Sequence, residues 1–184
     1  MTGLAMAEQE ITEINAKPFR AVLASVMVGT GAIVSYSVWA SHNGASPCPL
    51  CIFQRMLFMG IWTLAAMGVL LPRYLNKAVA ASLLLVALTG LSVATYQCLM
   101  QEFPGSVTNC GYADPTLIER IVDWAGTQSP FLFLATGYCE HKDIAFLGLS
   151  WAQLSAMAFL LLLVTAVWLG LPARISGAAH RTAR

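Results

Sequence analysis

Four long apolar stretches dominate the pattern of hydrophobic and polar positions along the chain. They cover residues 21–40, 52–71, 78–100 and 146–171, and Arg55 is the only charged residue inside them. About 20 helical residues, at a rise of about 1.5 Å each, cross the roughly 30 Å hydrocarbon core of a bilayer. A helix also satisfies its own backbone hydrogen bonds in lipid. The pattern therefore predicts an all-α membrane protein, a bundle of four transmembrane helices in a single domain over residues 1–184.

The segments between these stretches differ in basic charge. One set comprises residues 1–20, 72–77 and 172–184, and the other comprises 41–51 and 101–145. Seven of the ten Lys and Arg residues fall in the first set, two fall in the second, and the last is Arg55. Because Lys and Arg accumulate in cytoplasmic loops, we expect both termini in the cytoplasm and the second set outside.

Composition supports a membrane protein over two alternatives. Hydrophobic residues make up 58% of the chain and charged residues 10%, against about 45–50% and 25% in soluble domains. A soluble helical bundle would have too few charges for a water-facing surface. A cleaved signal peptide ending near Ala40 is disfavoured, because the first stretch exceeds the roughly 7–15 apolar residues of such a peptide. The net charge of +1 gives no basic field that would indicate nucleic-acid binding.

The second outer segment, residues 101–145, is long for a connection and so is expected to carry function. Asp114-Pro115 has the character of an N-cap followed by a first-turn proline. From Leu117 to Trp124, apolar residues then recur at helical spacing with charged residues between them. The pattern predicts a short amphipathic helix. It can lie on the membrane surface or pack on its own domain, and the sequence does not decide between the two.

Four of the five cysteines fall in the outer segments. The compartment outside the cytoplasm allows disulfides to form and persist. Cys110 and Cys139 bracket the long outer segment, and they form either a structural disulfide or a pair that exchanges with other thiols. Cys98, at the end of the third stretch, is interpreted as a small buried hydrophobic residue, with a position lining a ligand pocket as the alternative.

Cys48 and Cys51 form a CxxC motif at the start of the second span. The exposed N–H groups and the helix dipole at that end stabilise a thiolate on Cys51. Arg55 lies one turn further along the same helix face, where its charge can favour the thiolate or bind a ligand oxygen. The alternative for Arg55 is that it only extends to the lipid headgroups. A zinc site is disfavoured because no second CxxC or histidine pair is present, and we predict no metal.

At this point the motifs resemble a known family. "CPLCIFQR" at the start of a span, four spans, and an outer segment with "GYC" and "FLGLSW" before the last span resemble DsbB, the bacterial membrane disulfide bond formation protein. The resemblance covers roughly residues 19–171. It implies an inner-membrane thiol oxidase that reoxidises a periplasmic DsbA-like protein and passes the electrons to a membrane quinone, either ubiquinone or menaquinone.

The resemblance also implies roles for single residues. Cys110–Cys139 would be the pair that the DsbA-like partner attacks, and Cys48–Cys51 the pair beside the quinone. Cys51 would meet the quinone, Arg55 would supply the charge on the quinone side, and Cys48 would exchange with Cys139. Cys98 lies outside the family's four-cysteine pattern. A different class remains open: a non-catalytic four-helix scaffold whose outer segments are held by structural disulfides.

Overall fold

Four long helices make up most of the structure. It is a computed structural model, and it describes residues 2–72, 75–103, 115–139, 142, 144–146 and 148–179. The long helices are α1 (Thr2–His42), α2 (Pro49–Leu70), α3 (Asn76–Glu102) and α6 (Trp151–Ala179). Each contains a segment long and apolar enough to cross a membrane. The all-α, four-span prediction is therefore confirmed.

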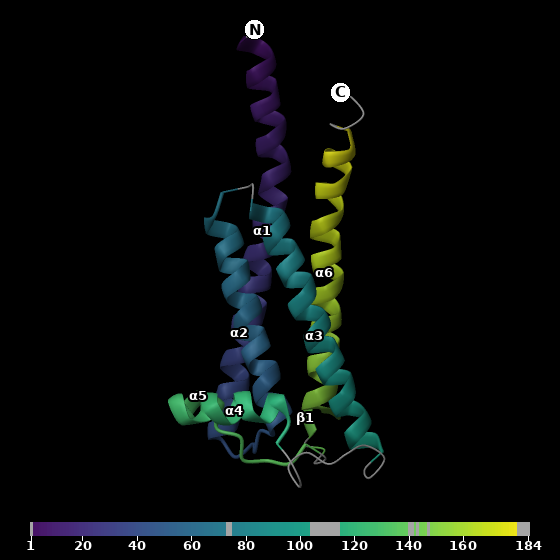
Figure 1. Cartoon of the computed structure of the whole chain (residues 1–184). Coiled ribbons are helices and arrows are strands. Elements are labelled where there is room, and N and C mark those ends of the chain that lie inside the picture. The colour runs from purple at the N-terminus through teal and green to yellow at the C-terminus, as the bar shows by residue number, and fades with distance from the viewer. Residues whose placement is uncertain are drawn as a thin grey trace.

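The helices pack in sequence order around a main apolar core. α1 packs on α2, α2 on α3, and α3 on α6. At the centre, the rings of Phe58 and Phe159 stack with their centroids 4.2 Å apart. Figure 1 shows the N-terminal end of α1 and the C-terminal end of α6 at one end of the bundle, with α4 and α5 at the other. The start of α1 and the end of α6 therefore lie at the same end of the bundle, and the side of the membrane that this end faces stays a prediction.

The last long helix begins at Trp151, whereas the apolar pattern predicted its span from Phe146. The preceding residues form a small antiparallel pair, β1 (Ile144–Phe146) with β2 (Leu149–Ser150). Gly148 adopts a φ of +80° between the two strands, a conformation that an α-helix does not contain. Ser150 and Gln153 then cap the helix reciprocally, each accepting the other's backbone N–H. Hydropathy alone could not locate this start, because an apolar strand and an apolar helix have the same average.

The predicted outer helix is present as α4 (Leu117–Gln128), followed by the single turn α5 (Pro130–Phe133). The N-cap of α4 is Thr116, and a capping box pairs Thr116 with Glu119. The predicted cap Asp114 lies outside the described residues, and the helix begins after Pro115 and not at it.

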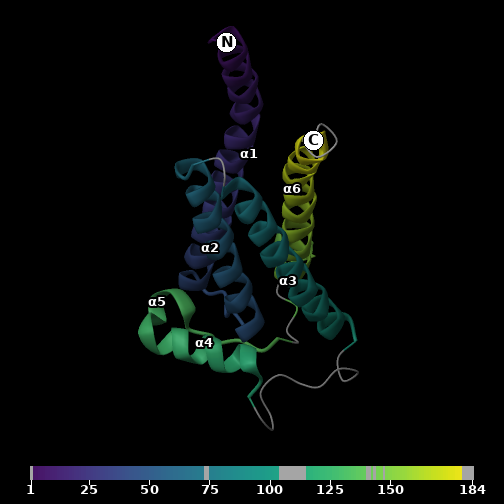
Figure 2. The same ribbon diagram turned by 45° about the horizontal axis from the view of Figure 1, so that its top comes forward.

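Figures 1 and 2 show α4 and α5 lying across the end of the bundle beside α2. α4 buries Val122 and Ala125 and contacts α2, so it packs on its own domain. Leu117 and Trp124 remain exposed. Contact of that exposed side with the membrane surface stays a prediction.

Candidate active site

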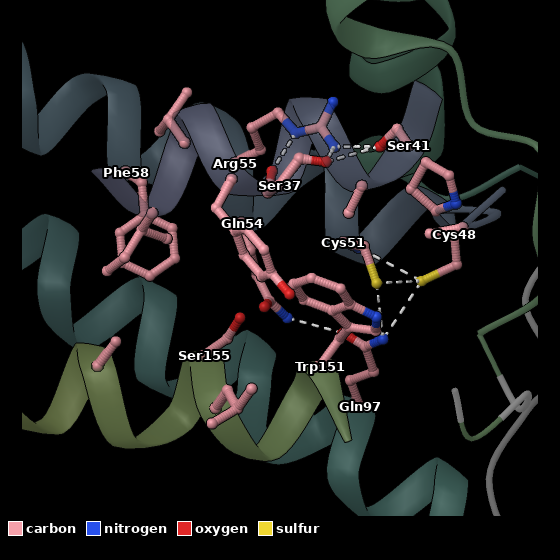
Figure 3. Close-up of a pocket in the computed structure, with 18 of the residues that line it drawn as sticks. Ser37, Ser41, Cys48, Cys51, Gln54, Arg55, Phe58, Gln97, Trp151 and Ser155 are labelled. Carbon is pink, nitrogen blue, oxygen red and sulfur yellow. Dashed lines mark hydrogen bonds between the residues drawn. The ribbon is translucent and has the colours of Figure 1, made fainter. Parts of the chain in front are cut away.

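The CxxC motif forms the first turn of α2. Cys48 is the N-cap, with extended backbone angles, and Pro49 occupies the first helical position. The Cys48 Sγ accepts the backbone N–H of Cys51 at 3.3 Å, in the way that a serine cap does. The two Sγ atoms lie 3.0 Å apart, with the Cys48 thiol donating to Cys51 (Figure 3). A cap residue and the third residue of the helix are therefore in direct sulfur contact.

The second outer segment brings Cys139 against Cys48. The backbone N–H groups of Thr136 and Gly137 both donate to the carbonyl of Pro47, at 2.9 and 3.1 Å. Two residues further on, Cys139 is buried and packs in one apolar cluster with Cys48. The Cys139 side chain is also the largest cause of the raised pKa of Cys48. Cys48, Cys51 and Cys139 thus form a three-cysteine cluster in which Cys48 is in sulfur contact with Cys51 and packs with Cys139.

The surroundings of Cys48 keep it protonated. Its hydrogen bond with Cys139, then the one with Cys51, then burial raise its pKa above the ordinary thiol value. The Cys51 sulfur accepts the Cys48 thiol. Hydrogen bonds directed at a sulfur favour its thiolate form.

Two other cysteine predictions have different outcomes. Cys110 lies outside the described residues. Cys98, on α3, is half-buried and is not among the residues that line the cavity described below. The interpretation of Cys98 as a buried residue is therefore only partly correct, and the pocket-lining alternative is wrong.

Two glutamines that the sequence reasoning did not single out hold the cysteine pair. The Gln97 amide nitrogen on α3 donates to Cys51 Sγ at 3.1 Å and to Cys48 Sγ at 3.3 Å. Its carbonyl oxygen accepts from the Gln54 amide on α2 at 2.8 Å (Figure 3). Both glutamines are almost fully buried. A signal was present in the sequence, since polar residues inside membrane spans are rare and commonly functional.

Arg55 is only 5% exposed, so it does not extend to the lipid headgroups. Its Nε donates to Ser37 Oγ at 2.7 Å, and its Nη2 donates to Ser41 Oγ at 2.6 Å and to the Ser37 carbonyl at 2.9 Å. Nη1 donates to the Leu132 carbonyl of α5 at 2.6 Å. In the part of the chain that the structure describes, no carboxylate pairs with this guanidinium. A cation balanced only by neutral acceptors attracts negative charge, and Cys51 is the group with which it interacts electrostatically.

A cavity of about 310 Å³ lies beside the cysteine pair. Its polar part contains Cys48, Cys51, Gln54, Gln97 and Arg55. Its remaining lining comes mainly from α1 and α6, with Ile33, Val34, Tyr36, Phe58, Trp151, Leu154 and Ala158 among the residues. Figure 3 shows the two sulfurs and Gln97 at one side of this space and Phe58 at the other. The cavity therefore joins a polar, sulfur-bearing side to an apolar side between membrane-spanning helices.

The rings of Tyr36 on α1 and Trp151 on α6 lie 5.6 Å apart. Both line the cavity, and Tyr36 is also 47% exposed. Tyr36 therefore lines the cavity and also reaches the surface of the bundle.

Comparisons with known proteins extend over the same elements. The sequence model of one family, described as "Disulfide bond formation protein DsbB", matches residues 18–169. The chain is 47% identical over 116 residues to Disulfide bond formation protein B of Dechloromonas aromatica (strain RCB), which covers 62% of this chain and 68% of that protein. It is 35% identical over 155 residues to the protein of the same name from Azoarcus sp. (strain BH72), covering 82% and 91%.

Proposed function

The chain belongs to the DsbB family of membrane disulfide bond formation proteins, and from that premise we propose that it is a quinone-dependent thiol oxidase. In this proposal it reoxidises a periplasmic DsbA-like dithiol protein and passes the two electrons to a membrane quinone. The observation that carries the proposal is the three-cysteine cluster at the edge of the cavity. Cys139, Cys48 and Cys51 are in the order that sequential disulfide exchange requires.

In this proposal, electrons pass from the partner to the CxxC pair by successive disulfide exchanges. The reduced partner breaks the Cys110–Cys139 disulfide and leaves as an oxidised protein, with both cysteines reduced. The Cys139 thiolate attacks Cys48 in the Cys48–Cys51 disulfide, forming Cys48–Cys139 and releasing the Cys51 thiolate. Cys110 then attacks Cys139, which restores Cys110–Cys139 and leaves Cys48 as a thiol. Two electrons have moved from the partner to the CxxC pair.

The positions of the sulfurs support this order. Cys48 is in sulfur contact with Cys51 and packs in one cluster with Cys139, which supports Cys48 as the sulfur at which exchange would occur. The sulfur that leaves should be the one whose thiolate is better stabilised. Cys51 meets that condition, because it accepts the Cys48 thiol, accepts the Gln97 amide at 3.1 Å against 3.3 Å for Cys48, and lies in the first turn of α2.

A strong electron acceptor is needed at the end of this sequence. A DsbA-type oxidase has a reduction potential of about −120 mV, whereas ordinary structural disulfides lie below about −300 mV. Reducing an ordinary disulfide with such a partner would run against ~180 mV, or about 8 kcal/mol for two electrons. A quinone, when bound, supplies the missing driving force by taking two electrons and two protons as the CxxC disulfide reforms.

The residues of the cavity fit a quinone head group. A volume of about 310 Å³ lies at the lower end of the range for small-ligand sites. A quinone ring is apolar on its faces and carries two carbonyl acceptors. The cavity offers apolar walls together with the cationic side chain of Arg55 beside Cys51. Ubiquinone and menaquinone share these features, so the fit does not choose between them.

The proposed location is the bacterial inner membrane, with both termini in the cytoplasm and the cysteines on the periplasmic side. The bundle supports it, because the three-cysteine cluster lies at the first turn of α2, at the end of the bundle opposite the start of α1 and the end of α6 (Figure 1). The Lys and Arg distribution gives the direction.

Purified full-length protein with a reduced DsbA-like protein and a short-chain ubiquinone tests the proposal. We expect quinone reduction to require Cys51 and Cys110, so that Cys51→Ser and Cys110→Ser each lower the rate by at least about a hundredfold. The matched control is Cys98→Ser, which should retain the parental rate. Parental activity in Cys51→Ser would refute the proposed role of Cys51, and a parent protein that reduces no quinone would favour the non-catalytic scaffold.

A further inference from the structure

Gly137 and Ser46 approach each other more closely than any other residue type at position 137 would allow. A Cβ placed on Gly137 would lie 2.1 Å from the carbonyl oxygen of Ser46 and 2.9 Å from its carbonyl carbon. Real Cβ contacts essentially never fall below 3.0 Å. The obstructing atoms belong to backbone, so no side-chain rotation relieves the contact.

The conflict comes from the distance between two segments and not from the backbone conformation of the glycine. The glycines with positive φ in the described residues are Gly44 and Gly148. Alanine at 137 therefore meets no conformational strain of its own, but it must push the two outer segments apart. The displacement needed is on the order of 1 Å, the difference between 2.1 Å and an ordinary contact.

The same crossing sets the position of two sulfurs. Thr136 and Gly137 donate their N–H groups to Pro47, the residue next to Ser46. Cys48 follows Pro47 directly, and Cys139 follows Gly137 by two residues. Any separation of the segments at Gly137 is therefore transmitted over one or two residues to the contact between Cys48 and Cys139.

We propose that Gly137 is a positioning residue for disulfide exchange between Cys48 and Cys139. Its missing side chain lets the two outer segments approach until the Cys48 and Cys139 side chains pack together. Thiol–disulfide exchange needs the attacking sulfur in contact with the sulfur that it attacks, and a misplacement of about 1 Å can slow a positioned reaction about a hundredfold. The proposal rests on the exchange step of the proposed function, and it concerns this contact only, not the transfer of electrons from Cys51.

The test measures bridge formation directly. In a Cys51→Ser, Cys110→Ser background, the full-length protein is treated with diamide, an oxidant of thiol pairs, and the Cys48–Cys139 bridge is quantified by mass spectrometry after thiol blocking. We expect Gly137→Ala to slow bridge formation by about tenfold to a hundredfold. Gly60→Ala is the matched control, because a Cβ at Gly60 meets no atom within 4 Å. A rate for Gly137→Ala within about twofold of its parent would overturn the proposal.

A second measurement separates positioning from general damage. In a background that retains only Cys48 and Cys51, Gly137→Ala should oxidise this pair with diamide at the parental rate. If that oxidation slows as much as bridge formation, Gly137 supports the fold in general and the proposal fails. Adding a short-chain ubiquinone to the same two-cysteine protein tests the proposed function separately. A quinone that leaves the pair reduced counts against the quinone reaction, while the diamide rates still decide the role of Gly137.

Discussion

Arg55 in the second membrane helix donates a hydrogen bond from Nη1 to the backbone carbonyl of Leu132 in α5, at 2.6 Å. The other nitrogens of the guanidinium donate to Ser37 and Ser41 on α1. One side chain thus joins two membrane helices to the outer segment that carries Cys139. The Arg55 side chain that places a positive charge beside the cavity therefore also holds α5 in position.

Replacing Arg55 should weaken quinone binding more than thiol exchange. Arg55→Ala removes a buried cation beside the cavity, and hydrogen bonds involving charged groups contribute about 1.5–3 kcal/mol each. Since about 1.4 kcal/mol is tenfold in affinity, we expect the KM for a short-chain ubiquinone to rise about tenfold to a hundredfold. Steady-state kinetics at saturating DsbA-like partner measure this value.

Arg55→Lys is the informative companion variant. Lysine keeps the charge but cannot reproduce the planar set of donors that Ser37, Ser41 and Leu132 accept. We expect it to raise KM nearly as much as alanine does. The exposed Arg20 provides the control, and Arg20→Ala should not change KM. An unchanged KM in both Arg55 variants would remove Arg55 from the binding site.

The protonation of Cys48 depends on Cys139. Because the hydrogen bond with Cys139 is the largest cause of the raised pKa of Cys48, Cys139→Ala should lower that pKa toward its ordinary value. A lower pKa means more thiolate at a given alkaline pH, so alkylation of Cys48 should begin at lower pH in the variant. Reduced protein is treated with iodoacetamide between about pH 7 and 10, a range that spans the ordinary cysteine pKa. Mass spectrometry then measures the shift in the pH at which Cys48 is alkylated. Coincident alkylation profiles would contradict the contact.

Gln97 should control the reactivity of Cys51. Gln97→Leu removes the amide donor from Cys51 and also leaves the buried Gln54 amide without its acceptor. A lost hydrogen bond to a thiolate of about 1.5 kcal/mol or more should slow alkylation of Cys51 at neutral pH about tenfold. Gln54→Leu keeps the contact of Gln97 with Cys51, so its effect should be smaller. Equal slowing in the two variants would show that packing, and not the donor, is responsible.

The sequence predicted those features that depend on local composition. Apolar runs define the four spans, because the bilayer imposes a length and a polarity on each helix. The CxxC spacing and its place at the start of a helix were also sufficient to place Cys48 and Cys51 together. The family resemblance indicated that Cys139 would meet Cys48, and the structure brings the two side chains together.

The features that escaped prediction depend on which helix faces meet. The contacts of Gln54 with Gln97, and of Arg55 with Ser37, join residues 43 and 18 positions apart. Each span is apolar nearly all round, so the pattern does not reveal which side of a helix faces its neighbours. The position of Gly137 against Ser46 is equally invisible, since it depends on a crossing of two irregular segments.

The packing of α3 on α6 gives a prediction about stability. A Cβ on Gly90 would lie 2.2 Å from the ring of Phe159, whose side chain is fully buried and stacks on Phe58. Overpacking of a buried site costs about 1–3 kcal/mol. Gly90→Ala should therefore lower the midpoint of thermal unfolding in detergent, followed by circular dichroism. Gly29→Ala adds the same methyl group to a helix where a Cβ meets no atom within 4 Å, and alanine favours helix over glycine by about 1 kcal/mol. Gly29→Ala should therefore keep or raise the midpoint of thermal unfolding. If the midpoint of Gly90→Ala is as high as that of Gly29→Ala, α3 and α6 do not pack this closely.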